Sequence, residues 1–181
     1  MLFVFIKGER SGTDVEQEGE ARLMILTDEL VLRAVTEEDI SEIGRMWNGG
    51  VDAAGAQRAL KYMTANHERN VNGPFYHLCL AVCKKDVPQK ILGWCGLDGK
   101  ETSEMPELFV LLDEDIRGKG YGTQCTKALL EYAVSIGLSQ VHGSCHMDNI
   151  ASARMMEKAG MRRYGTGENG APLFRYKKSS V

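Results

Sequence analysis

The hydrophobic pattern changes its period midway along the chain, and this change restricts the fold to one that mixes helices with a sheet. Within residues 40–47 and 53–67, apolar residues recur at helical spacing. The runs 77–83, 90–97 and 107–112 are strand-like instead, and a polar turn between the first two predicts an antiparallel hairpin. The sequence therefore predicts two adjacent helices followed by three strands.

The later segments alternate between the two kinds of element. Between Gly122 and Gly137, apolar residues follow the i, i+3, i+4 pattern of a helix with one buried face. The remaining expected elements are a strand at 30–32, a strand at 141–145, a helix at 149–159, and strands at 161–164 and 173–176. This order predicts an α/β fold with a mixed sheet and helices on both faces.

The length of 181 residues corresponds to about one domain. Residues 8–22 are polar and acidic without periodicity, so we predict an N-terminal extension over 1–23 and one domain over 24–178. Met24 is a candidate for the natural start. The apolar residues 1–6 are too few for a secretory signal or a membrane span, and we expect a cytoplasmic protein without a membrane partner.

The charge balance argues against some partners. The chain has 22 Lys and Arg against 25 Asp and Glu, which gives a formal net charge of −3. Proteins dedicated to nucleic acid or to anionic membranes normally have a basic excess. We therefore expect no nucleic-acid partner, and whether the chain forms a homodimer stays open.

The five cysteines do not form a recognisable metal or redox motif. None is spaced as Cys-x-x-Cys, and most lie in apolar runs, so they are interpreted as small core residues in a reducing compartment. His142, Cys145 and His146 are the best candidates for a zinc site. Adjacent residues of a strand point to opposite faces, however, so we expect no metal here.

The segment with the clearest chemistry is a glycine-rich stretch between a strand and a helix. Gly118, Gly120 and Gly122 alternate along it, and Arg117 and Lys119 add positive charge. Glycines let backbone N–H groups approach an anion, and the start of the following helix favours negative charge, so the stretch predicts a pyrophosphate cradle. A flexible loop with two solvated basic residues is the alternative. The spacing excludes a P-loop and fits a dinucleotide-binding motif only weakly.

Four blocks of the sequence resemble the GNAT superfamily of N-acetyltransferases. The stretch 117–122 fits its (Gln/Arg)-x-x-Gly-x-(Gly/Ala) acyl-CoA signature, and 106–113 is similar to the strand before that loop. The block 149–161 is similar to the family's Asn-x-x-Ser and Glu-Lys-x-Gly-Phe motifs, and 30–39 resembles the opening of the ribosomal-protein alanine N-acetyltransferase branch. The resemblance covers most of residues 24–176. It implies the GNAT acyl-CoA N-acyltransferase fold, in which the mixed central sheet is mostly antiparallel.

The resemblance also implies that acetyl-CoA is the cosubstrate and assigns residues to it. The backbone of Val110 and Leu112 would pair with the pantetheine arm, and the amides from Arg117 to Thr123 would hold the pyrophosphate. Asn149 would contact the pantetheine with Ser152 close by, and Arg154 would meet the ribose phosphate unless it is simply a solvated charge. The residues expected to bind acetyl-CoA are Val110, Leu111, Leu112, Arg117, Gly118, Lys119, Gly120, Tyr121, Gly122, Thr123, Asn149, Ser152 and Arg154.

Transfer is expected to be direct, with a primary amine attacking the thioester. An ammonium must lose a proton first, and Glu107 is the candidate general base, with a substrate-binding or structural acid as the alternative. Where many relatives have a tyrosine that protonates the leaving thiolate, this chain has Met156. Ser152 or solvent would then be the general acid.

The nature of the acceptor stays open. The branch resemblance suggests a protein N-terminal α-amine, but a small-molecule amine is equally compatible with the residues. A non-catalytic acyl-CoA-binding or regulatory module on the same fold is the main alternative, because the tyrosine is missing. A nucleotide-binding oxidoreductase is a more remote one.

Overall fold

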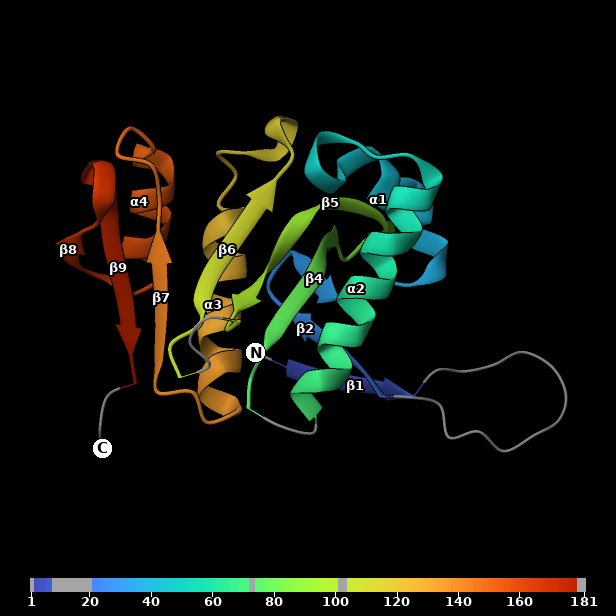
Figure 1. Ribbon diagram of the computed structural model, residues 1–181, viewed down its shortest axis with the longest axis horizontal. Helices are drawn as coiled ribbons and strands as arrows, with labels where there is room; N and C mark the ends of the chain where they lie inside the picture. Colours follow the sequence, from blue (N-terminus) through green and yellow to red (C-terminus); the bar gives the residue numbers. More distant parts are fainter. Residues whose placement is uncertain (1, 8–20, 72–73, 101–103, 179–181) are drawn as a thin grey trace, which may run out of the picture.

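The computed structural model describes residues 2–7, 21–71, 74–100 and 104–178 (Figure 1). Its centre is a nine-stranded sheet with the strand order β1-β2-β3-β4-β5-β6-β7-β9-β8. The strands are β1 (Leu2–Lys7), β2 (Ala21–Leu26), β3 (Leu30–Arg33), β4 (His77–Lys84), β5 (Val87–Asp98), β6 (Glu107–Leu112), β7 (Gln140–Ser144), β8 (Arg162–Thr166) and β9 (Pro172–Lys177).

Four α-helices accompany the sheet within the described residues. They are α1 (Ile40–Met46), α2 (Ala53–Val71), α3 (Tyr121–Ser135) and α4 (Ile150–Lys158). Short 3-10 helices are η1 (Glu37–Asp39), η2 (Trp47–Gly49), η3 (Glu114–Ile116) and η4 (Glu168–Gly170). The expected order from the strand at 30–32 onward is confirmed, and each expected helix or strand overlaps an observed one.

The alternation of side chains along the strands creates two cores, one on each face of the sheet. On β4, Leu78 and Leu80 belong to one core, whereas Cys79 and Ala81 belong to the other. Helices α3 and α4 cover the first core, and α1 and α2 cover the second. The prediction of helices on both faces is therefore confirmed.

All strand pairs of the sheet are antiparallel except β6 with β7. The hairpin predicted between the runs 77–83 and 90–97 is formed by β4 and β5. The parallel pair joins two halves of the sheet, because α3 crosses over between β6 and β7. The mixed, mostly antiparallel sheet agrees with the fold that the resemblance implied.

The sequence missed the start of the sheet. Strand β2 begins at Ala21, before the expected boundary at residue 24, and Leu23 is buried in the core. Strand β2 pairs with β1 on one side and with β3 on the other. Residues 8–20 of the expected extension lie outside the described residues.

One expectation about a cysteine was wrong. Strand β7 ends at Ser144, so Cys145 follows the strand, and it is only partly buried. The other four cysteines are buried, as expected. No helix among the described residues is long and apolar enough to cross a membrane.

Candidate active site

The candidate active site begins where β6 and β7 separate. The two strands pair only at Glu107 and His142, where the His142 N–H donates to the Pro106 carbonyl at 2.9 Å. Beyond this point β6 continues beside β5 alone and ends at Leu112. One edge of β6 is therefore open, and the two strands diverge in Figure 1.

The direction of the backbone groups shows which residues face this opening. The Asp113 N–H donates to the Leu92 carbonyl on β5 at 2.9 Å. Because successive residues of a strand direct their polar groups to opposite sides, the N–H and C=O of Val110 and Leu112 face the opening. The Leu112 carbonyl accepts a hydrogen bond from Arg117 Nε at 3.1 Å. The backbone of Leu111 faces β5, so only its side chain, which is 53% exposed, is available to a ligand.

The glycine-rich loop follows β6 and starts α3. Gly118 and Gly120 have φ values of 79° and 83°, a left-handed conformation that favours glycine. The first α3 amide with a partner inside the helix is that of Gln124, which donates to Gly120 at 3.1 Å. The preceding amides of Tyr121, Gly122 and Thr123 are at the positive end of the helix and are free to bind an anion.

The glycines do not all serve the same purpose. A Cβ at Gly118 or Gly120 would have no atom within 4 Å, so these positions border open space. A Cβ at Gly122 would come within 2.7 Å of Met155 Sδ on α4. A side chain at Gly122 would therefore displace the Met155 side chain, whatever the loop binds.

The two basic residues of the loop lie on its surface. Lys119 Nζ donates to the Asp115 carbonyl at 3.1 Å, and Arg117 lies 3.4 Å from a Glu114 oxygen. Both are exposed, so each is able to turn to a ligand at the cost of one solvent-exposed hydrogen bond or ion pair.

The start of α4 lies on the other side of the opening. Asn149 caps this helix, and its Oδ1 accepts a hydrogen bond from the Ser152 N–H at 3.0 Å. This structural role leaves the Asn149 Nδ2 available as a donor. Arg154 is exposed on α4, and Met156 is buried.

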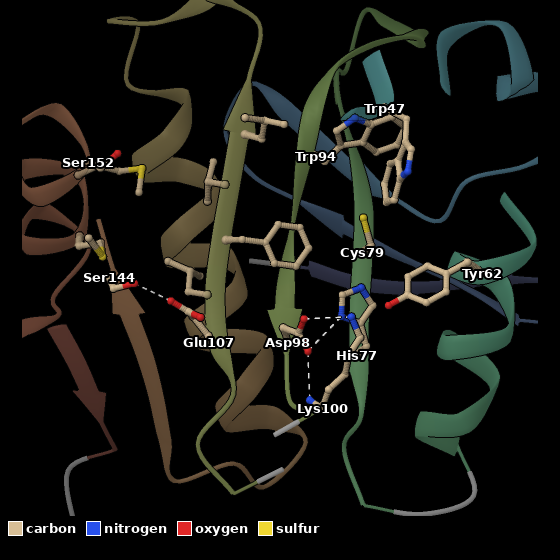
Figure 2. Close-up of a pocket in the computed structure, with 16 residues that line it drawn as sticks. Trp47, Tyr62, His77, Cys79, Trp94, Asp98, Lys100, Glu107, Ser144 and Ser152 are labelled. Atoms are coloured by element: carbon tan, nitrogen blue, oxygen red, sulfur yellow. Dashed lines mark hydrogen bonds and ion pairs between the residues drawn. The ribbon is translucent and has the colours of Figure 1, made fainter. Parts of the chain in front are cut away.

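A cavity of about 590 Å³ extends across β6 (Figure 2). On the side of the opening it is lined by Val110, Ser152 and Met156. On the other side it reaches Phe109 and the residues of β4 and β5. The cavity therefore connects the expected cosubstrate groove with a second compartment under α2.

Glu107 lies between these compartments. Its side chain is exposed, and its Oε1 accepts a hydrogen bond from the Ser144 hydroxyl at 2.7 Å, as Figure 2 shows. Both residues line the cavity together with Ser152. The structure thus brings both predicted catalytic residues to one cavity.

The second compartment contains a polar group that the sequence analysis did not identify. Asp98 accepts a hydrogen bond from Lys100 Nζ at 3.1 Å, and its other oxygen lies 3.6 Å from His77 Nδ1. Tyr62 on α2 completes the group, with the Lys100 ammonium 5.1 Å from its ring centre. These residues come from β4, β5 and α2 and meet only in the folded chain (Figure 2).

The surroundings determine the charges of this group. Burial lowers the pKa of His77, nearby Lys100 lowers it further, and Asp98 opposes both, so the imidazole is neutral at pH 7. Burial would raise the pKa of Asp98, but hydrogen bonds from Lys100 more than offset it, and the net effect is a lowered pKa. The neutral ring stacks on Phe109, with 5.8 Å between ring centres.

Two tryptophans form the far wall of the second compartment. The Trp47 and Trp94 rings meet edge to face with their centres 5.9 Å apart. With Phe109 and Tyr62 they give the compartment a largely aromatic lining. Such a surface accepts the apolar part of a substrate beside the polar groups.

The cysteines are poor nucleophiles in this structure. Burial raises the pKa of Cys79 to about 12 and that of Cys83 to about 11, so both remain protonated at neutral pH. Burial also raises the pKa of Cys145, which is the most accessible of the five. Within the described part of the chain, no three His, Cys, Asp or Glu side chains are grouped in a way that could hold a metal ion.

The comparisons with known proteins identify the family. Residues 29–162 match the acetyltransferase (GNAT) domain, so the chain belongs to the GNAT acetyltransferase family. It is an acyltransferase, as the sequence predicted.

Individual relatives are more distant. An uncharacterized N-acetyltransferase of Bacillus subtilis, YnaD, is 35% identical over 68 residues, which are 37% of this chain and 38% of YnaD. The chain thus aligns with well under half of that relative's length.

Solved structures show the same fold over most of the chain. RimL, a ribosomal alpha-N-protein acetyltransferase in complex with coenzyme A, has a TM-score of 0.71 at 15% identity, covering 85% of this chain and 97% of its own. A ribosomal-protein alanine acetyltransferase from Vibrio fischeri also has a TM-score of 0.71, at 14% identity, covering 85% of this chain and 96% of its own. At these identities the likeness shows a shared fold.

Proposed function

We propose that this chain transfers the acetyl group of acetyl-CoA to a primary amine by direct attack. The observation that carries the proposal is the cavity that crosses β6. It joins the open edge of β6 at Val110 and the start of α4 at Ser152 to the second compartment, which we assign to the acceptor. The site therefore has room for both substrates on the two sides of the reacting atoms.

The groove suits the acetyl-CoA that the family uses. The free edge at Val110 offers backbone groups to an amide-bearing chain such as pantetheine. The amides of 121–123 and the open space at Gly118 and Gly120 suit a pyrophosphate. Arg117, Lys119 and Arg154 would add charge, and Asn149 Nδ2 would serve as a further donor.

Glu107 acts as the general base, directly or through one water. The amine nitrogen forms a bond to the thioester carbonyl carbon, the C–S bond breaks, and the nitrogen proton passes to the Glu107 carboxylate. The thiolate takes a proton from solvent, either directly or through the Ser152 hydroxyl, which accepts a proton from water as it donates its own. A thiolate is a stable leaving group near neutral pH, so buried Met156 in place of a tyrosine does not prevent the reaction.

The test is thiol release from acetyl-CoA with a broad panel of amines, including peptide N-termini, amino acids and polyamines. We expect thiol release that depends on one class of amine, with a matching acetylated product in the mass spectrum. Tight CoA binding without turnover of any amine would favour the non-catalytic acyl-CoA-binding module. A cytoplasmic location stays a prediction.

A further inference from the structure

The strand register aligns six ionisable residues in one row across the sheet, one from each of six neighbouring strands. Each residue is opposite the next across a strand pair. From β4 to β8, the row consists of His77, Asp98, Glu107, His142, Arg175 and Arg162. Residues at matching positions share a face of the sheet, so this charged row lies on one face.

The part of the charged row beyond β6 is not covered by a helix of the described chain and is called the open part here. Tyr164 on β8 also lies there, with its hydroxyl 3.0 Å from His142 Nδ1. On β7 and β9, the neighbouring residues Val141 and Phe174 are buried in the core under α3 and α4. His142 and Arg175 therefore point to the opposite face. The helices on that face, α1 and α2, pack on β4 and β5 instead. A substrate that enters the cavity at Glu107 can extend along the open part of the row.

The charges at the two ends of this open part lack partners. Glu107 is bonded to the neutral hydroxyl of Ser144, and no Lys, Arg or His of the described chain forms an ion pair with it. Arg162 and Arg175 likewise have no carboxylate partner among the residues that the structure describes. The Arg175 guanidinium lies over the Tyr164 ring, 4.7 Å from its centre.

Asp98 differs from Glu107 in this respect. Its charge is balanced by Lys100 at 3.1 Å. The row therefore presents one unbalanced negative charge at the cavity and two unbalanced positive charges at its outer end. A complementary substrate has a cation at the cavity and an anion farther along.

We propose that the acceptor is a peptide N-terminus with an acidic side chain within its first few residues. This inference rests on the proposed acetyl transfer. Glu107 attracts the terminal ammonium before it takes the proton, and Arg175 with Arg162 attracts the acidic side chain. Two strand spacings of ~4.8 Å separate the backbones of Glu107 and Arg175, a distance of about 10 Å that an extended peptide covers in about three residues.

The same spacing disfavours other amines. A free amino acid carries its amine and carboxylate on one carbon, too close together to reach both ends of the row. A polyamine would place its second ammonium beside Arg175, where like charges repel. The arrangement thus selects for the separation of the two charges and for the sign of the second.

The test compares three tetrapeptide amides, Ala-Ala-Glu-Ala, Ala-Ala-Gln-Ala and Ala-Ala-Lys-Ala, as acceptors of the full-length chain. We expect the KM for the Glu peptide to be about three to five times lower than for the Gln peptide, and the KM for the Lys peptide to be the highest. The three kcat values should be similar, because the difference lies in binding. The preference should shrink at high ionic strength, since exposed charges are screened.

Arg175→Gln should nearly abolish the preference for the Glu peptide, so that its KM becomes almost equal to the KM for the Gln peptide. Arg162→Gln should weaken the same preference. Arg163→Gln is the matched control. Arg163 follows Arg162 on β8, but it is opposite the buried Phe174, so its side chain lies on the other face of the sheet. This variant should retain the wild-type preference. Equal KM values in the wild type, or the same loss in Arg163→Gln, would overturn the inference while leaving acetyl transfer intact. No thiol release with any amine would instead overturn both.

Discussion

At the scale of single residues, carboxylates with different surroundings serve different purposes. Asp39 is buried and receives two hydrogen bonds of 2.7 Å from Arg33, which makes it part of the framework. Glu107 is exposed and has a neutral partner, which leaves its charge available to a substrate. The same functional group therefore stabilises the fold in one place and faces the cavity in the other.

We expect Glu107→Gln to lower kcat/KM by roughly 10²–10³, because the variant keeps the shape of the side chain but cannot accept a proton. The loss should shrink as pH rises, since more of the amine is then already neutral. Ser144→Ala is the control, because it removes the hydrogen bond to Glu107 and keeps the carboxylate. Near-normal activity of Glu107→Gln at pH 7 would mean that water takes the proton unaided.

Asp39→Asn should lower the free energy of unfolding by about 3 kcal/mol at pH 7, because it leaves the Arg33 guanidinium without a counter-charge. Burial would raise the pKa of Asp39, but hydrogen bonds from Arg33 and Thr36 lower it below its usual value. The folded state thus binds this proton less readily than the unfolded state. The stabilisation is present above the unfolded pKa near 4 and is lost as pH falls through the lowered folded value.

Urea unfolding at pH 7 and at acidic pH measures this difference. The difference in the free energy of unfolding between wild type and Asp39→Asn should become smaller as the solution is acidified. A difference that does not change with pH would show that the loss comes from packing instead of charge.

At the scale of elements, the turn from β6 into α3 is the segment that we propose to hold the pyrophosphate of the cosubstrate. Gly120→Ala puts a Cβ on a residue with φ of 83°, which costs about 1–2 kcal/mol in that conformation and displaces the following amides. We expect a smaller rise in melting temperature on addition of CoA than in the wild type. Gly165→Ala is the control, because φ is not positive there and the nearest atom to an added Cβ is 3.9 Å away.

Gly122 is unsuitable for the same test. A larger side chain there would displace Met155, which itself lines the cavity. Loss of binding in such a variant would therefore not show that the loop holds the pyrophosphate. An unchanged CoA effect in well-folded Gly120→Ala would place the pyrophosphate elsewhere.

The elements that the sequence predicted well are those with a strong local signal. Helix α3 has one continuous apolar face, and it ends at Ser135 shortly before Gly137, whose φ is 89°. Strand β2 was missed because it follows a polar segment and pairs with β1 over six positions and with β3 over three, contacts that local periodicity does not reveal. Cys145 was misplaced for a related reason, since the pattern does not indicate that β7 ends one residue earlier.

At the scale of the whole molecule, the two halves of the site were not equally predictable. Asn149, Ser152 and the glycines are close in sequence to the elements that position them, so motifs were sufficient to propose them as site residues. His77, Asp98 and Lys100 become neighbours only through the register of β4 and β5. The predicted hairpin was the one available signal, because it brings the outer ends of those two strands together.

The whole fold should respond to the cosubstrate. A ligand that binds only the folded state stabilises it by about 2.7 kcal/mol at 100 times its Kd, which for a chain of this size corresponds to a rise of about 5–10 °C in Tm. We expect CoA and acetyl-CoA both to produce such a shift, because the protein groups proposed to bind them contact the pantetheine and the pyrophosphate, which the two ligands have in common. An unchanged Tm at millimolar CoA would contradict binding in the opening between β6 and β7, and would remove the basis for assigning the second compartment to an acceptor.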